Sequence, residues 1–395
     1  MGIYIHIPFC SHICPYCDFT TYAGKESVIP RYVAALERDL TRQAPLAADR
    51  EIVSVFIGGG TPSLLDGDQM RRIIAACRDT YRLADRCEIS VETNPNSLDL
   101  DRLVAYREAG IDRLSIGAQT LDRKGLRRLG RQHEADDVMT ALRNAHTAGF
   151  ERISVDLIFG WPGQTPESWR NDLDTLLGSA TPPNHLSLYS LIIEPGTPFA
   201  DAQTRGILRM PDDDETADLY EIAVDVLRDA GWTHYEIANW SRLPDDHSRH
   251  NALYWQHGDY LGIGAGAHGH LDGIRTINHL LPERWCAAVE GNESTVANTE
   301  TIDAATGVVE TVMMGLRLLQ DGISLPDFER RHGVELQTLC GNEIDRLAAL
   351  GLVDVMGDRI RLTDRGALLS NEVIARLTDF DPALVPDVRA GTAAE

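Results

Sequence analysis

The chain has 395 residues, of which 43% are apolar and 25% charged, so it is long enough for more than one domain and a large core. Its formal net charge of −23 repels nucleic-acid backbones over most of the surface, which excludes a general nucleic-acid-binding protein. No apolar run of about 18 residues and no basic-then-apolar leader are present, so we expect a cytoplasmic protein without a transmembrane segment. In that compartment its seven cysteines are better explained as metal ligands or core residues than as disulfides.

The first two hundred residues alternate short β-like runs with amphipathic helical stretches. Strands separated by helices pair in parallel through right-handed crossovers. The strands are apolar for much of their length, as expected when both faces are covered. The pattern predicts strands at 2–8, 52–57, 88–92, 113–117, 152–159 and 185–192, and helices at 29–43, 67–81, 100–109, 135–148 and 166–177.

Two folds fit this alternation, a doubly wound sheet and a whole or partial (β/α) barrel. The unusual residues follow successive strands: three cysteines at 10–17, the turn GGGT at 58–61, ETN at 92–94, then Gln119 and Asp156. Barrel sites are assembled from several strand ends, whereas a doubly wound sheet concentrates its ligand contacts at one switch point. The sequence therefore favours a partial, TIM-like barrel.

The second half of the chain changes character twice. A helix at 212–230 and a strand at 232–238 continue the first pattern, and residues 241–300 are looser and rich in His, Gly and Asn. Helices at 306–319, 325–331 and 336–350 then precede a hairpin with a Gly-Asp turn, which predicts a winged-helix-like α+β domain. Its third helix carries Arg346 beside Glu343 and Asp345, so we expect interaction rather than DNA reading. The predicted divisions are 1–240, 241–300, 301–380 and a flexible tail at 381–395.

Three cysteines in eight positions, Cys10, Cys14 and Cys17, are the sharpest chemical signal. A [4Fe–4S] cube has four irons, so three thiolates leave one iron open to a small molecule. The alternatives are a Cys₃His zinc site that uses His6 or His12, or unrelated buried thiols. The spacing favours the cluster, and the four remaining cysteines are isolated and predicted to be core residues.

The pattern C-x3-C-x2-C after a first strand, with Tyr16 before the last cysteine, resembles the radical S-adenosylmethionine (radical SAM) superfamily. The resemblance implies that the open iron binds the amino and carboxylate groups of SAM. It also implies that the turn Gly59, Gly60 and Thr61 contacts the SAM amino group. Glycines there allow close backbone approach and turn N–H groups towards a ligand.

A set of single residues on consecutive strand ends resembles the SAM contacts of the coproporphyrinogen dehydrogenase (HemN-like) branch. Taken one at a time, each is more often structural. By that resemblance some of them contact a second SAM molecule. The set comprises Tyr4, Glu92, Gln119, Arg131, Asp156 and Ser190, of which Gln119, Arg131 and Asp156 are the candidates for a second SAM.

Two departures separate this chain from that dehydrogenase branch. The branch carries a further cysteine two residues after the third, where this chain has Phe19, and an extension before the first strand. Both departures match the HemW-type heme chaperones instead, a resemblance that covers nearly the whole chain. It implies a carrier that binds heme and passes it to respiratory proteins at the membrane, and it assigns no catalytic residue. It also allows peripheral membrane attachment and a homodimer.

The most specific match to these chaperones is HNALYW at 250–255, followed by GIGAGAHG at 262–269. A histidine is a natural axial ligand of heme iron, and aromatic rings stack on porphyrin. Without the resemblance, His250 is more readily explained as a hydrogen-bonded structural residue. With it, we expect heme contact at or near His250, within a heme-associated segment at 241–300.

Two other functions stay open on sequence grounds. One is a radical decarboxylase of porphyrin metabolism that converts coproporphyrinogen III into protoporphyrinogen IX. The other is a zinc-bearing regulatory protein with a winged helix, which would be colourless rather than brown.

Overall fold

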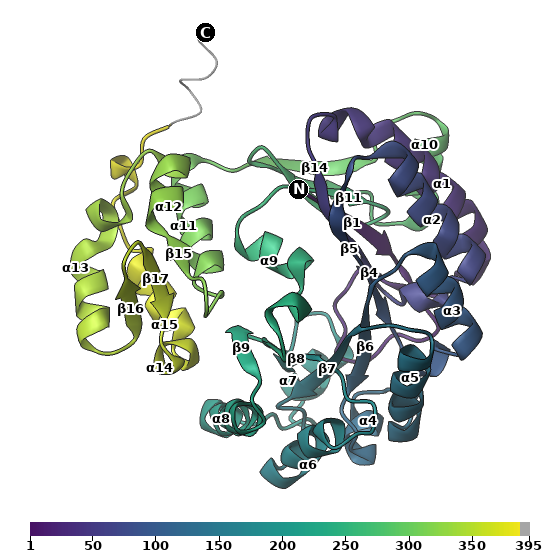
Figure 1. The fold of residues 1–395 in the computed structure, drawn as a ribbon, viewed down its shortest axis with the longest axis horizontal. Helices are drawn as coiled ribbons and strands as arrows, with labels where there is room; N and C mark the ends of the chain where they lie inside the picture. The colour runs from purple at the N-terminus through teal and green to yellow at the C-terminus, as the bar shows by residue number, and fades with distance from the viewer. Residues whose placement is uncertain (388–395) are drawn as a thin grey trace.

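Twelve strands form one continuous sheet that curves into an open barrel in the computed structural model, which describes residues 1–387 (Figure 1). Seven neighbouring strands are parallel, and antiparallel strands extend both edges. The parallel strands are β11 (Tyr260–Ile263), β1 (Gly2–Ile7), β4 (Ile52–Gly59), β5 (Leu83–Thr93), β6 (Arg113–Gln119), β7 (Arg152–Phe159) and β8 (His185–Ser190). The antiparallel strands are β10 (Asn239–Ser241) and β9 (Thr233–Glu236) beside β8, and β12 (His268–Leu271), β13 (Ile274–Asn278) and β14 (Val296–Thr301) beside β11.

The order of the central strands decides between the two folds that the sequence allowed. From β1 to β8 the strands neighbour one another in the order in which they occur in the chain. A doubly wound sheet reverses its strand order at a switch point, and no reversal occurs between these strands. The prediction of a partial barrel is therefore confirmed, and β11 adds a seventh parallel strand to the six that were predicted.

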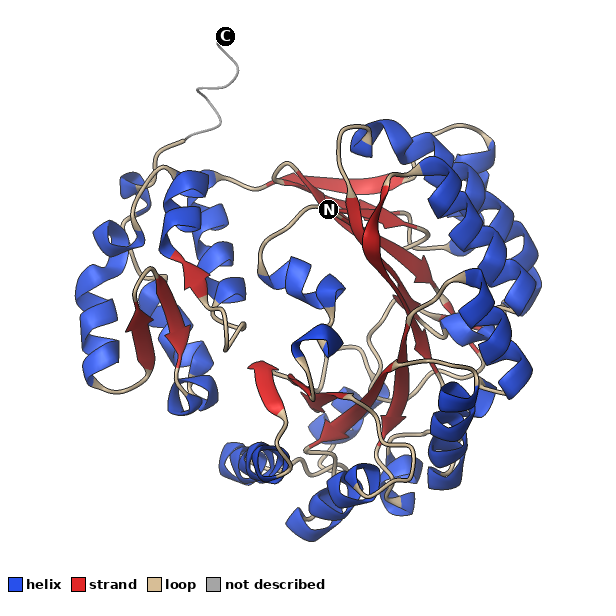
Figure 2. Cartoon of the chain, viewed as in Figure 1, coloured by secondary structure: helices blue, strands red, loops and turns tan. Residues whose placement is uncertain are grey.

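Helices cover the convex face of the sheet, while one short helix lies on its concave side (Figures 1 and 2). This inner helix, α9 (Arg249–Trp255), contacts β4. The outer helices are α1 (Ile29–Gln43), α2 (Gly67–Thr80), α3 (Leu100–Ala109), α4 (Arg123–Arg128), α5 (Ala135–Thr147), α6 (Pro166–Leu177), α8 (Asp213–Asp229) and α10 (Pro282–Glu290), and α7 (Pro198–Thr204) follows the loop after β8.

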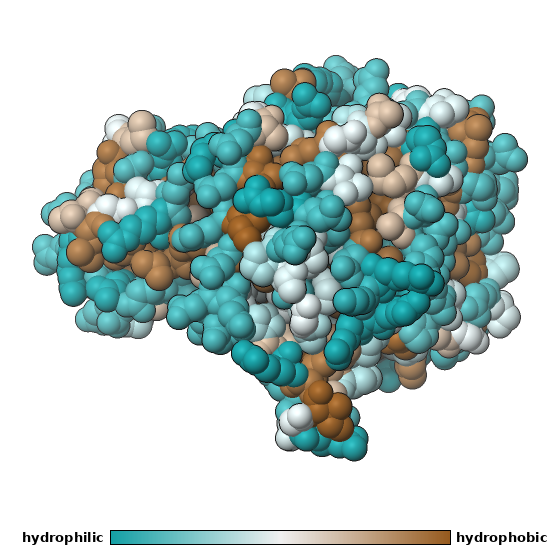
Figure 3. All heavy atoms as spheres, turned by 90° about the horizontal axis from the view of Figure 1, so that it is seen from below, coloured by the Kyte–Doolittle hydropathy of each residue, from teal (hydrophilic) through white to brown (hydrophobic). Residues whose placement is uncertain are grey.

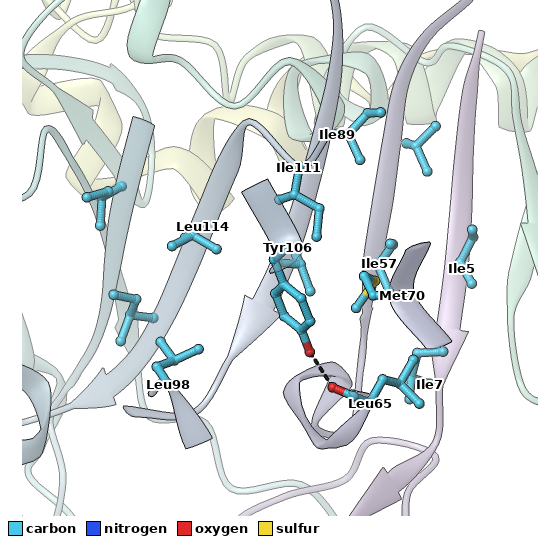
Figure 4. Packing of buried hydrophobic residues seen from close by; sticks show 14 of the residues in the cluster. Ile5, Ile7, Ile57, Leu65, Met70, Ile89, Leu98, Tyr106, Ile111 and Leu114 are labelled. Atoms are coloured by element: carbon cyan, nitrogen blue, oxygen red, sulfur yellow. Dashed lines mark hydrogen bonds between the residues drawn. The ribbon is translucent and has the colours of Figure 1, made fainter. Parts of the chain in front are cut away.

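Local sequence signals fix the outer helices, and their apolar stripes build the main core. Asp66 and Gln69 form a capping box at the start of α2. Gly110 ends α3 with a φ of 100°, which suits glycine. Figure 4 shows how the side chains between sheet and helices interdigitate, with the Tyr106 hydroxyl donating a hydrogen bond to the Leu65 carbonyl at 2.6 Å.

The segment 241–300, which the sequence predicted to be looser than the rest, contains regular helices and strands. It supplies α9 inside the barrel, three strands that extend the sheet beyond β11, and α10 against α1. Its many glycines obscured these short strands, because glycine weakens the pattern of a strand. Gly262 needs the absence of a side chain, since a Cβ would lie 2.2 Å from the His268 carbonyl oxygen.

The C-terminal domain has its own core and the arrangement of a winged helix. Three helices precede a hairpin, as the sequence predicted, and a short strand adds a third member to that small sheet. Its elements are α11 (Ala304–Gly315), β15 (Ile323–Ser324), α12 (Leu325–His332), α13 (Leu336–Ala349), β16 (Val353–Met356), β17 (Arg359–Leu362), α14 (Asp364–Leu368) and α15 (Ser370–Leu377).

The described part of the predicted flexible tail, residues 381–387, contains a short turn and contacts the C-terminal core. Pro382–Leu384 form a 3-10 turn, and Phe380 and Val385 pack against the C-terminal core. Residues 388–395 of that prediction lie outside the described residues. Within 1–387 no helix is long and apolar enough to cross a membrane. The face turned to the viewer in Figure 3 is largely hydrophilic, with separate apolar patches.

We expect the Tyr32→Phe substitution to lower the free energy of unfolding by about 1–3 kcal/mol. The Tyr32 hydroxyl donates to the His6 carbonyl at 2.9 Å and accepts from the Ala265 N–H at 2.7 Å, and so joins α1 to β1 and to the loop after β11. Removing it leaves two buried backbone groups without a partner. Urea unfolding followed by circular dichroism measures the change.

Tyr22→Phe is the matched control for this experiment. Tyr22 is half-buried, its ring lies under Lys25, and its hydroxyl makes no hydrogen bond within residues 1–387. Equal unfolding free energies for the two variants would contradict the role given to the Tyr32 hydroxyl.

Candidate functional site

A cavity of about 510 Å³ opens at the carboxyl ends of the parallel strands. The structure brings all the predicted site residues to its wall except Tyr4 and His250. The predicted residues that line it are Cys10, Cys14, Tyr16, Cys17, Gly59, Gly60, Thr61, Glu92, Gln119, Arg131, Asp156 and Ser190.

The three cysteines lie on one loop at the rim of this cavity. Cys10 belongs to β2 (Phe9–Cys10), which pairs with β3 (Tyr22–Ala23), so both ends of the loop are fixed. A turn closes between the other two, where the Cys17 N–H bonds to the Cys14 carbonyl at 3.1 Å. Burial raises the pKa of both Cys10 and Cys17.

Two polar side chains of the barrel donate to the cysteine sulfurs. The Thr61 hydroxyl donates to Cys10 Sγ at 3.4 Å, and Arg131 Nη1 donates to Cys14 Sγ at 3.6 Å. The Arg131 Nε atom is buried and has no partner within the described residues. A cationic, incompletely satisfied guanidinium beside thiols favours an anionic group at this place.

The glycine turn after β4 lies directly against the cysteine loop. Gly59 has a φ of 113°, and a Cβ there would lie 2.5 Å from the His6 ring. A Cβ on Gly60 would lie 2.7 Å from the Phe9 carbonyl oxygen and 3.0 Å from Cys10 Sγ. Glycine is therefore required at both positions, because only a chain without side chains fits between β4 and the loop.

Glu92 ends β5 as the neighbour of this glycine turn. Its Oε2 accepts a hydrogen bond from the Gly59 N–H at 2.9 Å. Burial raises the pKa of Glu92 from its ordinary value of 4.5 to about 7, despite that hydrogen bond. A carboxyl group with such a pKa accepts or donates hydrogen bonds to a polar ligand near neutral pH.

Arg131, in the loop after α4, and Asp156, within β7, face the cavity and already bond to protein groups. Arg131 Nη2 donates to Asn94 Oδ1 at 2.5 Å and to the Gly117 carbonyl at 2.9 Å. Asp156 accepts the Ser115 hydroxyl at 2.8 Å, and burial raises its pKa. These bonds fix the orientation of both side chains.

Gln119 and Ser190 complete the predicted ring of strand ends. Gln119 has a φ of 66°, a left-handed conformation that is uncommon for a residue with a side chain. Such conformations cluster at functional sites. Ser190 is the last residue of β8 and is exposed.

Several cavity residues escaped the sequence analysis, although a signal for them existed. In the predicted strands, polar residues alternate with buried aliphatic ones, and the polar set turns inward. Arg113 shows the pattern, since it is only 2% exposed at the start of β6 yet lines the cavity. The missed inward residues are Arg113 and Ser115 on β6 and Ser187 and Tyr189 on β8, whereas Asn94 and Asn251, which also line the cavity, belong to the stretches ETN and HNALYW that the sequence analysis singled out.

Tyr4 lies beneath the site rather than in it. Its hydroxyl is 2.7 Å from His6 Nδ1, and His6 Nε2 is 2.9 Å from the Thr20 carbonyl. The pair ties β1 to the end of the cysteine loop. Both ring nitrogens of His6 are therefore engaged, and within residues 1–387 no three His, Cys, Asp or Glu side chains are arranged to hold a single metal ion.

His250 does not line the cavity, and heme contact at or near this residue stays a prediction. It is fully buried, with Nδ1 2.8 Å from the Ser54 hydroxyl and Nε2 2.8 Å from the Tyr254 hydroxyl. Its ring stacks on Phe56. Both nitrogens are thus satisfied by the protein, as in the structural explanation that the residues alone favoured.

The rest of HNALYW connects the barrel to the C-terminal domain. Asn251 lines the cavity at one end of α9, and Arg317 lies over the Trp255 ring at 5.1 Å at the other. His257, just after the helix, lies 3.1 Å from the Thr311 hydroxyl of α11. The motif is a structural link between the cavity and the second domain.

The fold and the cavity define a partial-barrel protein of the radical SAM type, and comparisons with known proteins agree. The Radical SAM superfamily matches residues 4–176, and the HemN C-terminal domain matches residues 302–369. The solved structure of coproporphyrinogen III oxidase (HemN) from Escherichia coli covers 96% of this chain and 90% of its own, with a TM-score of 0.80 and 23% identity.

Curated relatives narrow the family further. The heme chaperone HemW of Bacillus subtilis is 35% identical over 94% of this chain and 97% of its own length. The heme chaperone HemW of Escherichia coli is 34% identical over 95% of this chain and 97% of its own. The chain belongs to the HemW family within the radical SAM superfamily.

Replacing Glu92 with Gln should remove a pH-dependent loss of stability. Because the folded-state pKa lies above the unfolded one, folding binds a proton between the two values, and stability falls as pH rises through about 7. Between pH 5 and pH 8 the wild type should lose about 2.5 kcal/mol more unfolding free energy than Glu92→Gln. Parallel stability–pH curves for the two proteins would refute the raised pKa.

Proposed function

We propose that this chain is a cytoplasmic heme chaperone that carries one [4Fe–4S] cluster, binds SAM and heme, and delivers heme to respiratory proteins at the membrane. The observation that carries the proposal is the set of three cysteines at the cavity, with Phe19 rather than a further cysteine beside them. The HemW relatives, matched over almost their whole length, support the heme part.

Cys10, Cys14 and Cys17 are the residues that would hold the cluster. A bound [4Fe–4S] cluster supplies an iron without a protein ligand, to which a small molecule attaches. The Thr61 hydroxyl and the Arg131 guanidinium stabilise the negative charge of the sulfurs, since both donate to them. The side-chain-free surface of Gly60 leaves room beside Cys10.

The zinc alternative is less well supported by these contacts. Of its two candidate histidines, His6 has both nitrogens bonded to Tyr4 and Thr20. A four-ligand zinc site needs its ligands converging on one point. The cysteine loop instead borders a wide cavity with polar walls.

The polar walls next to the cysteines suit the groups of SAM. The Gly59–Thr61 turn offers a close backbone approach, and Glu92 offers a carboxyl oxygen to an ammonium or a ribose hydroxyl. Gln119, Arg131 and Asp156 also line the cavity wall. Arg131 and Asp156 already bond to protein groups, which argues against a second SAM molecule at that place.

Delivery to a membrane requires contacts outside the cavity. We infer peripheral attachment at the inner face and formation of a homodimer as parts of the same proposal, because a carrier must meet its acceptor and release its cargo there. The alternative, decarboxylation of coproporphyrinogen III, is disfavoured by Phe19, which occupies the place of a cysteine in the dehydrogenase branch.

Cys14→Ala should abolish cluster assembly and leave the fold intact, because the loop lies at the rim rather than in the core. After anaerobic reconstitution we expect about four irons per wild-type chain and almost none in the variant. Iron and sulfide analysis with the visible absorption spectrum measures this. Cys87→Ala, a half-buried cysteine of β5 outside the cavity, is the control and should keep its cluster. A full cluster in Cys14→Ala would overturn the assignment.

The reconstituted wild type should bind hemin saturably, with a shifted Soret band, and should not consume coproporphyrinogen III under reducing, anaerobic conditions with SAM. These two assays separate the carrier from the enzyme. Absence of hemin binding together with formation of protoporphyrinogen IX would establish the dehydrogenase and reject the chaperone.

A further inference from the structure

A short helix of unusual charge lies at the carboxyl end of the barrel strands. Helix α4 follows β6 directly and carries four exposed cations in six residues, Arg123, Lys124, Arg127 and Arg128. The chain as a whole has a net charge of −23, so this helix is opposite in charge to the rest of the protein. Arg123 lies 3.8 Å from Glu134, and the other three cations form no ion pair within residues 1–387.

The stability of α4 does not explain these cations. Arg127 and Arg128 suit the last turn, where the helix dipole is negative, but Arg123 and Lys124 lie in the first turn, where the dipole is positive. Lys124 also comes three and four positions before Arg127 and Arg128, spacings at which like charges destabilise a helix. Cations that destabilise their own helix indicate a surface that meets an anionic partner.

Two exposed isoleucines lie beside this helix. Ile192, in the loop after β8, is 68% exposed, and Ile207, after α7, is 64% exposed. Each is next in the chain to a residue that packs on a small apolar cluster at the end of α4, and Ile207 lines a cavity of about 470 Å³ together with Arg128. The cluster consists of Leu129, Trp161 and Phe199, with Tyr16, Leu191, Ile193 and Leu208 packed against it.

The cysteine loop continues this surface. Its Ile13 and Phe19 are 43% and 65% exposed. The loop lies against the end of α4, since a Cβ on Gly130 would be 2.6 Å from the Pro15 side chain. Large apolar side chains from three loops therefore surround the mouth of the cavity on the side of the basic helix.

Cations beside exposed apolar side chains fit the surface of an anionic membrane. Lysine and arginine attract anionic headgroups, and single apolar side chains enter the boundary between headgroups and acyl chains. A nucleic acid or a soluble phosphate would engage the cations and leave the isoleucines in water. Acidic residues flank the surface, Asp18 and Glu194 at the mouth and Glu215 on α8, so the attraction depends on α4.

We propose that this surface, the docking face, binds an anionic lipid surface with the mouth of the cavity turned towards the headgroups. The inference rests on the proposed delivery of heme at a membrane and names the part of the chain that meets the membrane. The opening of the barrel then lies within reach of an acceptor in the bilayer. The docking face consists of Ile13, Phe19, Arg123, Lys124, Arg127, Arg128, Ile192 and Ile207.

Sedimentation of the cluster-reconstituted protein with lipid vesicles tests the docking face. The wild type should bind vesicles of equal parts phosphatidylcholine and phosphatidylglycerol, bind pure phosphatidylcholine much less, and lose this difference at high salt. The variant Lys124→Gln/Arg127→Gln/Arg128→Gln should bind the anionic vesicles about tenfold to a hundredfold more weakly, because each basic residue near such a surface contributes roughly fivefold. Its hemin binding should equal that of the wild type.

The matched control changes the net charge equally at three exposed arginines outside the docking face. It should bind the anionic vesicles like the wild type. Two of its positions lie on α1 and α10, which are far from α4 (Figure 1), and the third follows α2. The control is Arg38→Gln/Arg82→Gln/Arg284→Gln.

Ile207→Ser tests the apolar part of the docking face. It should weaken binding to the anionic vesicles by about threefold or more at low and high salt alike, because a contact with the acyl chains is not screened. Leu46→Ser is its control, a leucine 52% exposed next to α1, and should leave vesicle binding unchanged.

The outcomes are distinct. Undiminished anionic-vesicle binding by the α4 variant would overturn the docking face. Wild-type binding by Ile207→Ser would overturn its contact with the bilayer and indicate a soluble anionic partner instead. A wild type that binds hemin but no vesicles would overturn the docking face and leave the chaperone function standing, whereas one that binds no hemin would reject the proposed function itself.

Discussion

The site depends on hydrogen bonds that continue the parallel pairing of β1 and β4 beyond the ends of both strands. The Gly60 N–H bonds to the Ile7 carbonyl at 2.9 Å, and the Thr61 N–H bonds to the Phe9 carbonyl at 2.8 Å. These two bonds hold the glycine turn against the start of the cysteine loop. They place the Thr61 hydroxyl on Cys10 and turn the Gly59 N–H to Glu92. Three strands are thereby coupled at one point, and a side chain on either glycine would separate them.

A second buried interaction holds the inner helix in the barrel. Glu88 has no exposed surface and accepts from Arg152 at 2.5 Å and from the N–H groups of Arg249 and His250 at the start of α9. Burial opposes its charge, yet Arg113 and Arg152 outweigh burial and hold the pKa of Glu88 below its ordinary value. A buried carboxylate of this kind is stable only when fully paired. The N–H groups at the start of α9, the helix that carries HNALYW, therefore complete the hydrogen bonding of the buried Glu88 carboxylate.

The barrel could be predicted because each strand and helix has a recognisable pattern in its own stretch of sequence. Parts of the site could not be predicted because the surroundings of their residues are formed by segments far away in the sequence. The six strands could be predicted from apolar runs that alternate with helices. The cysteines, the glycine turn and Glu92 could then be recognised as site residues because they lie at the ends of those strands. A histidine, in contrast, has the same appearance in a sequence whether it binds iron or a serine. The partners of His250 are Ser54 on β4 and Tyr254 one turn away, and only the fold shows that α9 enters the barrel.

The strands within the segment 241–300 were not predicted, for a related reason. Its strands are short and contain glycines, so alternation is weak, and β11 joins the parallel sheet beside β1, which is far away in the sequence, as well as pairing with β12. Arg113 and Ser115 were missed although they alternate with Leu114 and Ile116, because a serine or arginine in a strand also suits a solvent-facing surface. Only the pairing of β6 with its neighbouring strands in the closed barrel shows that Arg113 and Ser115 point into the barrel.

The pairing of β1 with β11 also sets an order of events during synthesis. Gly2 pairs with Tyr260 and Ile5 with Ile263, so one edge of the first strand waits for a partner that is made more than halfway through translation. At about 5–20 residues per second, that partner leaves the ribosome roughly 10–40 s after β4, the neighbour on the other edge. An apolar strand with an open edge is prone to pair with other chains during this interval. The nascent barrel is thus most vulnerable to misassembly before its last parallel strand emerges.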